Sequence, residues 1–345
     1  MTRWAVILAG GIGSRFWPLS TPERPKQLLP LVNTRSLLAN TLDRLSDIVS
    51  PEHTLILTNA SLAEAISRAA PALPPGNVIA EPKPAGTAAA LAWAAREIRQ
   101  RTGDDSTMIC VHADWTIADD QGFRDALLEA ERVALEEHTL VTVGIVPSRP
   151  DPGFGYIQPG EITASGARHV TRFVEKPSRA NAARMLTEGY LWNSGIFAWR
   201  VEDFLADIAN HTPEVSAALI HAAGAGLGAF FEAVTPVSVD VGVLERSRRV
   251  RVVPGDFGWD DVGTWGALQR VKSADANGNV ASGHVFALDS HSNVVHAEDG
   301  AVVLYGVDDL VVVSRRGLTL VTTTEKSAEL KTLIDALPED LRGDQ

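Results

Sequence analysis

The most constraining feature of the sequence is an apolar run, Trp4–Leu8, that ends directly in the glycines Gly10, Gly11 and Gly13. A short run that is apolar at every position predicts a strand covered on both faces, as in a parallel sheet. Glycine tolerates positive φ and leaves backbone amides unobstructed, so several N–H groups can converge on one anion. This segment therefore predicts a buried strand that leads into an anion-binding turn.

Short apolar runs and helical periodicities alternate as far as residue 146. We expect further strands at 54–58, 107–111 and 139–146, and helices at 36–49, 61–70, 85–101 and 121–137. Such alternation predicts a sheet with helices on both faces and a ligand beyond the carboxyl ends of its strands. Between about 150 and 275 we expect loops and mixed strands that complete the site. Alternation across 196–200 predicts that half of that strand faces a core.

The character of the chain changes after 275–279. Turn residues there separate short β-runs at 284–288, 294–297, 301–305, 310–313 and 318–322, and a helix is expected at 327–337. We therefore predict two domains, residues 1–276 with the chemistry and a small β domain of residues 277–345, stacked or resembling a left-handed β-helix. Because exposed β edges and apolar strands find partners, this β domain is the expected contact of a homodimer.

The net charge of −12 disfavours binding to nucleic acid or to anionic membranes. Residues 1–30 nevertheless carry four basic side chains, Arg3, Arg15, Arg24 and Lys26, against one acidic side chain. Positive charge around a glycine turn in an acidic protein suits a small anionic ligand.

Three features of the sequence indicate where the protein is located. No apolar stretch approaches the length of a membrane span, and the run 4–9 is too short for a signal peptide. The single cysteine, Cys110, lies in an apolar run and is expected to be a buried structural thiol. These features favour a cytoplasmic protein.

Two familiar glycine motifs do not fit the first turn. A Walker A loop needs Gly-Lys-Ser/Thr, whereas Gly13 is followed by Ser14 and Arg15. The Rossmann fingerprint needs a third glycine where Phe16 stands. The turn, together with the cations Arg15 and Lys26, predicts a different triphosphate site.

Residues 5–31, with LAGGIGSRFWPLS and PKQLLPL, resemble the opening signature of the sugar-nucleotide pyrophosphorylases, and specifically the mannose-1-phosphate guanylyltransferases. Four further blocks follow in family order: RPDPGFGYI, FVEKP, YLWNSGIFAWR and DFGWDDVGTWGAL. The resemblance implies an α/β fold of the nucleotide-diphospho-sugar transferase type. Its Rossmann-like sheet would be mixed, mainly parallel and flanked by helices, and a small C-terminal β domain would follow.

The resemblance also implies a reaction, in which GTP and mannose 1-phosphate give GDP-mannose and pyrophosphate. The sugar phosphate oxygen is already ionised and would attack the α-phosphorus in line, without a general base. Arg15 and Lys26 would be the catalytic cations. Nucleotide contacts would come from Leu8, Ala9, Gly10, Gly11, Gly13, Ser14, Glu81, Gly86 and Thr87. Sugar-phosphate contacts would come from Gly155, Glu175, Lys176 and Asn193.

Magnesium is the expected metal, because nucleotidyl transfer joins two anions and Mg²⁺ needs few protein carboxylates beside substrate oxygens. Asp114 follows the predicted strand 107–111, and Asp261 matches the family's aspartate before Val-Gly. We expect the metal on these two residues. The adjacent Asp260 occupies a variable family position and is expected to cap a turn.

Two segments depart from the family pattern. The family usually has arginine and asparagine where Ala85 and Gly86 stand, although Glu81 and Thr87 remain. Glu81 would accept hydrogen bonds from guanine N1–H and the exocyclic amine, and the Gly86 amide would serve the base carbonyl.

The second departure surrounds the first metal aspartate. His112 stands at a customary proline and Trp115 at a customary histidine. The loop is therefore expected to differ locally from the family, whereas the aspartate itself remains.

Three other readings stay open. Guanylyl transfer to another sugar, such as a heptose phosphate, or transfer of another nucleotide fits the same motifs. A non-catalytic regulatory relative would bind sugar nucleotides, but it would not need every cation and carboxylate that is present. A dehydrogenase is weaker, because the Rossmann fingerprint fails. The sequence leaves no room for the isomerase domain of longer bifunctional relatives, so transferase activity alone is expected.

Overall fold

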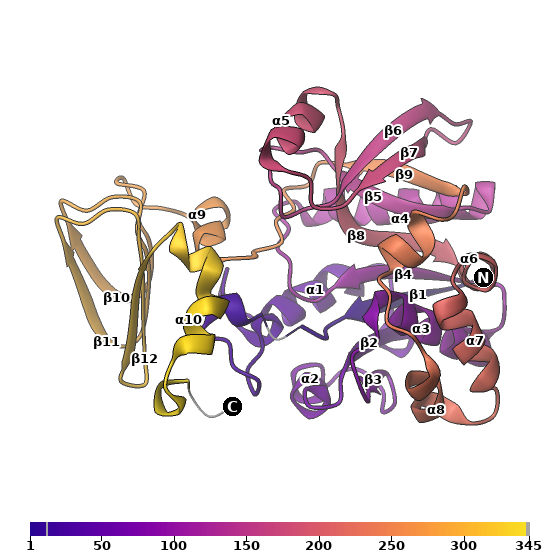
Figure 1. The fold of residues 1–345 in the computed structure, drawn as a ribbon, viewed down its shortest axis with the longest axis horizontal. Coiled ribbons are helices and arrows are strands. Elements are labelled where there is room, and N and C mark those ends of the chain that lie inside the picture. Colours follow the sequence, from indigo (N-terminus) through magenta and orange to yellow (C-terminus); the bar gives the residue numbers. More distant parts are fainter. Residues whose placement is uncertain (12, 343–345) are drawn as a thin grey trace.

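The computed structural model describes residues 1–11 and 13–342 of the chain. Its strands form two sheets that lie apart along the long axis of the molecule (Figure 1). The larger sheet has nine strands in the order β3-β2-β1-β4-β8-β5-β9-β7-β6, and the smaller has the order β10-β11-β12-β13. The larger sheet, with helices packed against it, is the mixed α/β fold expected from the sequence.

The strands of the larger sheet are β1 (Thr2–Leu8), β2 (Thr54–Asn59), β3 (Val78–Glu81), β4 (Ser106–His112), β5 (Leu140–Ile145), β6 (Tyr156–Ile162), β7 (Arg168–Val174), β8 (Leu191–Arg200) and β9 (Val250–Gly255). The helices that pack with it are α1 (Leu37–Ser46), α2 (Ala63–Ala69), α3 (Gly86–Thr102), α4 (Asp120–Glu137), α5 (Arg179–Thr187), α6 (Val201–His211), α7 (Pro213–His221) and α8 (Gly226–Ala233). Of these strands, β3, β6, β7 and β9 were not predicted individually from the sequence.

Parallel pairing brings the expected ligand-binding ends together. β1 lies between β2 and β4, and all three run in the same direction. The register sets Leu8 beside Leu57 on one side and His112 on the other. The turn after β1 therefore lies next to the segment that follows β4, at the carboxyl edge where α/β proteins bind ligands.

Both faces of the sheet are buried, including both faces of β8. Phe197 and Trp199 belong to the apolar cluster on the face covered by α3 and α6. Ile196 and Ala198 belong to the cluster on the opposite face, with residues of α4. The expectation that only half of 196–200 faces a core is therefore wrong, because helices cover β8 on both sides.

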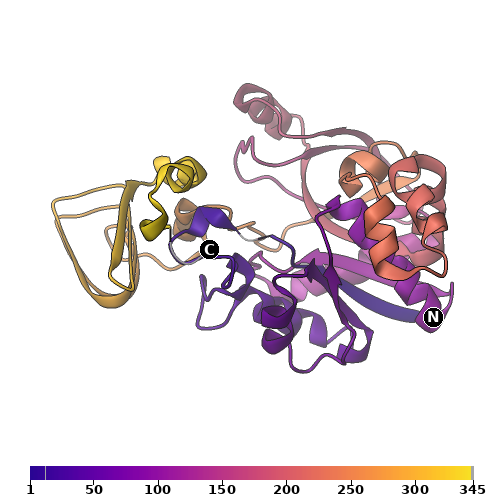
Figure 2. The same ribbon diagram turned by 60° about the horizontal axis from the view of Figure 1, so that its bottom comes forward.

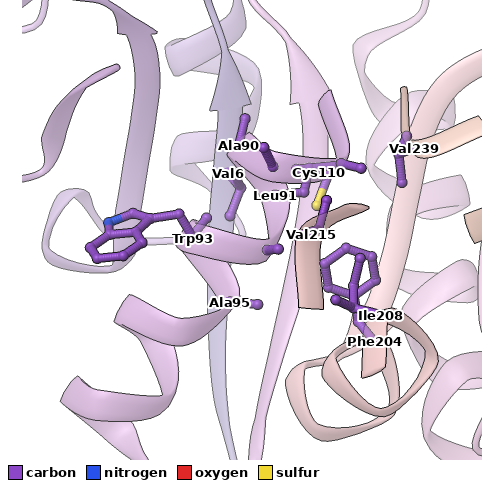
Figure 3. Close-up of a cluster of buried hydrophobic side chains, with 14 of the residues drawn as sticks. Val6, Ala90, Leu91, Trp93, Ala95, Cys110, Phe204, Ile208, Val215 and Val239 are labelled. Carbon is purple, nitrogen blue, oxygen red and sulfur yellow. The ribbon is translucent and has the colours of Figure 1, made fainter. Parts of the chain in front are cut away.

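Figure 3 shows the first of these clusters, in which Val6 and Cys110 of adjacent strands pack with Leu91 of α3 and Phe204 of α6. Cys110 is fully buried, and burial raises the pKa of its thiol well above the usual value. It is the structural cysteine that the sequence indicated.

The second sheet contains β10 (Val280–Leu288), β11 (Val294–Tyr305), β12 (Leu310–Arg315) and β13 (Leu318–Thr323). The first three strands pair in parallel. Figure 2 shows this region at the end of the molecule far from the N-terminus. The prediction of separate strands at 294–297 and 301–305 is wrong, because β11 continues through Gly300 while its pairing with β10 shifts near Gly283. In place of one helix over 327–337, a 3₁₀ turn leads into α10 (Leu330–Ala336).

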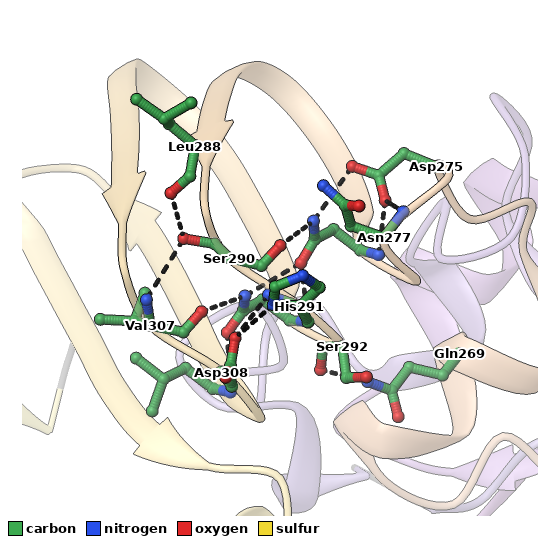
Figure 4. A network of polar contacts seen from close by, with 12 residues as sticks. Gln269, Asp275, Asn277, Leu288, Ser290, His291, Ser292, Val307 and Asp308 are labelled. Carbon is green, nitrogen blue, oxygen red and sulfur yellow. Dashed lines mark hydrogen bonds and ion pairs between the residues drawn. The ribbon is translucent and has the colours of Figure 1, made fainter.

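Buried asparagines hold the turns of this second region together. Asn293 donates to the carbonyl of Val307 and to Oδ1 of Asn279, and it accepts from the Leu310 amide. Figure 4 shows the surrounding network, in which Ser290 joins neighbouring turns at Leu288 and Val307. The polar groups that are buried here form hydrogen bonds with the neighbouring turn, as buried polar groups in proteins generally do.

The second region packs directly behind the glycine turn. Phe16, which follows that turn, belongs to one apolar cluster with Val294 and Leu330, and its ring lies 5.2 Å from that of Trp265. The β region thus supports the segment that carries Arg15. Among the described residues, no helix is both long and apolar enough to cross a membrane.

Candidate functional site

Two adjoining cavities lie at the carboxyl edge of the larger sheet. The first, of about 340 Å³, is lined by most of the predicted nucleotide contacts: Leu8, Ala9, Gly10, Gly11, Glu81, Gly86 and Thr87. The second, of about 200 Å³, is lined by Gly13, Arg15, Lys26, Asp114 and Asp261. His112 and Asp114 line both cavities, so the two join at the end of β4. Ser14 lies exposed in the 3₁₀ turn between Gly13 and Arg15.

Side chains behind the glycine turn orient its peptide groups. The Ala9 carbonyl accepts hydrogen bonds from Gln27 Nε2 and Thr58 Oγ1, and the Gly10 carbonyl accepts one from Asn59 Nδ2. In a trans peptide the next N–H points away from the carbonyl. The amides of Gly10 and Gly11 therefore point away from the bonded carbonyls, and both glycines line the first cavity together with Gln27 and Asn59.

Gly13 makes room for Lys26. Its φ is 71°, and a Cβ at this position would lie 2.3 Å from Lys26 Cβ. A side chain here would be strained by the backbone and would displace the lysine. Gly10 and Gly11 differ, because a Cβ on either would meet nothing within 4 Å. Their missing side chains leave space on the ligand side.

Lys26 links the two predicted metal-binding aspartates. Its side chain is buried, and Nζ donates to Asp114 Oδ2 at 2.9 Å and to the Asp261 carbonyl at 2.7 Å. Burial opposes ionisation of Asp114, but Lys26 and His112 hold the pKa of its carboxyl below the usual value. Burial raises the pKa of Asp261 despite Lys26. Ionisation is therefore favoured at Asp114, whereas the ionised form of Asp261 would be stabilised by a further cation nearby.

The donor set suits a magnesium ion that takes most of its ligands from substrate and water. Within residues 1–11 and 13–342, no group of three or more His, Cys, Asp or Glu side chains is arranged to hold a metal. Asp114 and Asp261 nevertheless line the same cavity, and one or two carboxylates plus phosphate oxygens are a usual Mg²⁺ site. The residues present therefore fit the expected ion.

Glu81 forms part of the far wall of the first cavity. It is the last residue of β3 and is half-buried, and burial raises the pKa of its carboxyl to about 7. A carboxylate that has lost part of its hydration gains when a ligand supplies N–H donors. This environment suits a base that presents two donors on one edge.

The start of α3 completes the same cavity. Gly86 has a φ of 80°, and a Cβ there would lie 2.3 Å from the Val237 carbonyl oxygen. Thr87 Oγ1 accepts a hydrogen bond from the Val239 amide at 2.8 Å. Thr87 therefore fixes the 237–239 segment against α3, a structural role that the sequence did not suggest.

The predicted sugar-phosphate contacts lie together where β7 ends and where β6 and β8 begin. The Asn193 amide donates to the Gly155 carbonyl at 2.8 Å. A Cβ on Gly155 would lie 2.7 Å from Glu175 Oε2. Lys176 Nζ lies 3.3 Å from Glu175 Oε1, and the lysine side chain is 69% exposed. None of these four residues lines the two cavities described above.

Sequence reasoning missed Asp240, which joins this group. Asn193 Nδ2 donates to Asp240 Oδ1 at 2.6 Å, although 47 positions separate the two residues. Asp240 begins a π-helical turn, Asp240–Leu244, directly after the segment that Thr87 fixes. The carboxylate orients the Asn193 amide. No local motif marks this contact, because it depends on a pairing between distant segments.

Asp260 has the structural role expected of it. Its carboxylate accepts from Arg270 Nε at 2.8 Å and from the Val262 amide at 2.9 Å. The side chain is buried, and these bonds fix the turn that carries Asp261. Of the two adjacent aspartates, Asp261 alone lines the second cavity.

Comparison with known proteins gives two family matches. The nucleotidyl transferase family matches residues 4–278, which include both cavities. A family described as the mannose phosphate isomerase/GMP-like β-helix domain matches residues 283–337.

Individual relatives align with nearly the whole chain. A mannose-1-phosphate guanylyltransferase of Escherichia coli is 37% identical over 98% of this chain and 74% of its own length. One from Klebsiella pneumoniae has the same identity and coverage. A crystal structure described as mannose-1-phosphate geranyltransferase from Thermus thermophilus superposes with a TM-score of 0.91 and 36% identity. It covers 97% of this chain and 99% of its own.

Proposed function

Because the chain belongs to the nucleotidyl transferase family, we propose that it is an enzyme that transfers a guanylyl group from GTP to mannose 1-phosphate. The products are GDP-mannose and pyrophosphate. The assignment of the two substrates rests on one observation: nearly the whole chain aligns with relatives named mannose-1-phosphate guanylyltransferase. The two cavities that meet at Asp114 support the reaction, because they provide adjacent places for a nucleoside and for its phosphates.

The glycine turn and its cations hold the triphosphate. The amides of Gly10 and Gly11 face the phosphates, and Arg15 and Lys26 offset the negative charge that develops on the leaving pyrophosphate. The sugar phosphate needs no general base, because its oxygen is ionised near neutral pH. Rate acceleration then comes from alignment of the two reactants and from charge stabilisation.

Asp114 and Asp261 would hold Mg²⁺. When bound, the ion supplies positive charge that polarises a phosphoryl oxygen. Lys26 keeps both aspartates in place through its bonds to the Asp114 carboxylate and the Asp261 carbonyl. Its ammonium therefore serves the geometry of the carboxylates as well as the charge balance of the site.

The mannose unit is assigned to the group where β7 ends and where β6 and β8 begin. Glu175 accepts hydrogen bonds from sugar hydroxyls, and Asn193 donates to them. Gly155 leaves the space that the Glu175 side chain needs, and Lys176 binds the phosphate. Asp240 fixes the Asn193 amide, as its 2.6 Å contact supports. Lys176 is exposed and flexible enough to follow the incoming sugar phosphate.

Guanine is favoured by the buried carboxylate of Glu81. Guanine offers an N1–H and an exocyclic amine side by side, whereas uracil and thymine offer one N–H. A geranyl group, named for the Thermus relative, is a hydrocarbon with no N–H donor. It would leave the half-buried Glu81 without a partner, which is costly.

Pyrophosphate release tests the function directly. The four nucleoside triphosphates, each combined with mannose 1-phosphate, glucose 1-phosphate or a heptose phosphate, should give fastest turnover with GTP and mannose 1-phosphate. Omission of Mg²⁺ should stop the reaction. Turnover confined to UTP or dTTP with glucose 1-phosphate would overturn the substrates but keep the reaction class. Binding of GDP-mannose without turnover of any pair would support a regulatory relative instead.

We also propose that the chain has the two domains predicted from the sequence, residues 1–276 and 277–345. The second domain would form a homodimer through its sheet. Phe286 pairs with Val303 and Leu288 with Tyr305 across β10 and β11, and all four side chains are exposed. Adjacent exposed apolar pairs on a sheet favour association. Sedimentation should give a dimer that Phe286→Lys converts to a monomer, whereas a monomeric wild-type protein would contradict the proposal.

A further inference from the structure

His112 occupies the junction of the candidate site. It is the last residue of β4, lies beside Leu8 in the sheet, and lines both cavities. Asp114, two residues further on, is the other residue that lines both. A group in this position faces the point where the nucleoside cavity passes into the cavity of cations and carboxylates.

The imidazole is held by packing rather than by polar contacts. Its ring lies 4.9 Å from that of Trp115, which in turn lies edge-on to Trp259 at 5.8 Å. Within the described part of the chain, neither ring nitrogen forms a hydrogen bond that would explain a histidine here. Packing fixes the direction of the ring and leaves its polar edge for another partner.

Gly195 leaves the imidazole the room that it needs. Its φ is 72°, and a Cβ at this position would lie 3.1 Å from His112 Nε2 and 3.3 Å from its Cδ2, closer than ordinary side-chain contacts. With glycine here, the ring keeps the position in which His112 lines both cavities.

On the basis of the function proposed above, we propose that His112 is a substrate-contact residue. Its Nε2–H donates a hydrogen bond to a phosphate oxygen at the junction of the nucleotide and the sugar phosphate. The bond aligns the two reactants where the new phosphoanhydride forms. The ligand class is a nucleoside diphosphate sugar, or its two precursors bound together. The customary proline at this position has no side-chain donor, so the contact is particular to chains with histidine here.

Variants that move the donor test the role of Nε2. His112→Ala removes the donor, His112→Gln keeps an amide N–H near the Nε2 position, and His112→Asn places one nearer Nδ1. A hydrogen bond to a charged group predicts a loss of kcat/KM of roughly 10- to 100-fold for the alanine variant. The glutamine variant should recover most of this loss, and the asparagine variant should not. His221→Ala, which removes an exposed histidine at the end of α7 that lines neither cavity, is the control and should retain turnover.

A binding experiment separates this inference from the function itself. In the wild-type protein, the NMR signals of the His112 ring should shift when GDP-mannose is added and should shift far less with guanosine. Calorimetry should show that His112→Ala weakens GDP-mannose binding by about tenfold or more. Melting temperatures of all variants check that each remains folded.

Two outcomes would overturn the role of His112. One is an alanine variant whose turnover and GDP-mannose affinity remain within about twofold of the wild type. The other is equal loss in the alanine and glutamine variants, which would assign the histidine to packing. Absence of guanylyl transfer by the wild type would instead refute the proposed function, and the ring signals would still decide whether His112 contacts phosphate.

Discussion

The chain buries polar side chains in two places, and the two differ in what surrounds them. In the second sheet, Asn279 and Asn293 donate and accept within a stack of turns. In the first, Lys26 is buried as deeply, but its partners Asp114 and Asp261 line a cavity. One cluster is complete without a ligand, whereas the other directs charge toward one.

This difference separates stability from function. Buried polar groups that satisfy one another fix a fold, and their loss leaves unpaired partners. Charged groups that face a cavity have shifted pKa values, as those of Asp114 and Asp261 do, and such groups often mark functional sites. Substitutions in the cluster around Lys26 should reduce turnover, and those among the asparagines should reduce stability.

Asp261→Asn should have the largest effect on turnover. The amide is nearly the same size but cannot offset the charge of a metal, so kcat should fall on the order of 1,000-fold or more. Steady-state pyrophosphate release over a range of Mg²⁺ concentrations measures this loss. The melting temperature should change little, because the Asp261 atom bonded by Lys26 is its carbonyl oxygen.

The neighbouring Asp260→Asn is the matched control. Asp260 holds Arg270 and the Val262 amide, so its loss should lower the melting temperature more than it lowers kcat of the folded enzyme. Near-native activity of Asp261→Asn, or a greater loss of kcat in Asp260→Asn, would contradict the assignment of the metal to Asp261.

Lys176→Ala should raise KM for mannose 1-phosphate by about 10- to 100-fold, because one charge-assisted bond to the phosphate is lost. KM for GTP should stay within about twofold, since Lys176 lies with Glu175 at the end of β7. Lys326→Ala, which removes another exposed lysine, is the control. An increase confined to KM for GTP would contradict the division of the site into nucleotide and sugar parts.

Glu81 predicts that GTP binding weakens at low pH. Its pKa of about 7 lies above the ordinary value, so the folded protein protonates this carboxyl as pH falls through 7. Guanine N–H donors need the ionised form, of which roughly one tenth remains at pH 6. KM for GTP should therefore rise about tenfold from pH 8 to pH 6.

Glu81→Gln removes this titration and serves as the control. Its KM for GTP should be higher at pH 8 and nearly constant down to pH 6. The stability of the fold should change with pH in the opposite direction. Because the pKa of Glu81 is raised in the folded protein, the free energy of unfolding falls as pH rises from the ordinary pKa of a glutamate to about 7. A wild-type KM that does not change with pH would exclude Glu81 as the base contact.

Local patterns in the sequence predicted much of the nucleotide side of the site. The glycine turn and Asp114 each follow a predicted strand, so parallel pairing alone brings them to one edge. Glu81 was predicted only from the family resemblance, because the short strand β3 that it ends was not identified. Asp240 could not be predicted in this way, because its contact with Asn193 depends on how 237–239 packs against α3. The same applies to Gly195, whose missing side chain matters only once β8 lies beside His112.

The second sheet shows a different limit of sequence reasoning. Its strands were identified, but the continuity of β11 was not, because Gly300 reads as a turn. A signal for the stack was present as Asn279-Val280 and Asn293-Val294, where each asparagine precedes a buried valine. Two copies are too few for a repeat to stand out until the structure shows that their turns lie one above the other.

Asn293→Ala tests the other half of the comparison and should change turnover least. The side chain accepts from the Leu310 amide and donates to the Val307 carbonyl, and both partners would lose a bond in a site that water does not reach. Each unpaired group costs about 1–3 kcal/mol, so the loss of two bonds should lower the free energy of unfolding by about 2–6 kcal/mol. Urea unfolding followed by tryptophan fluorescence measures this loss.

At temperatures where the Asn293→Ala variant is folded, kcat and both KM values should stay within about twofold, because no atom of Asn293 lines either cavity. Ser292→Ala, one residue earlier in the same turn, is the control for stability. A large loss of turnover in folded Asn293→Ala would mean that the stack also sets the position of Arg15 through the apolar cluster that joins Phe16 to Val294.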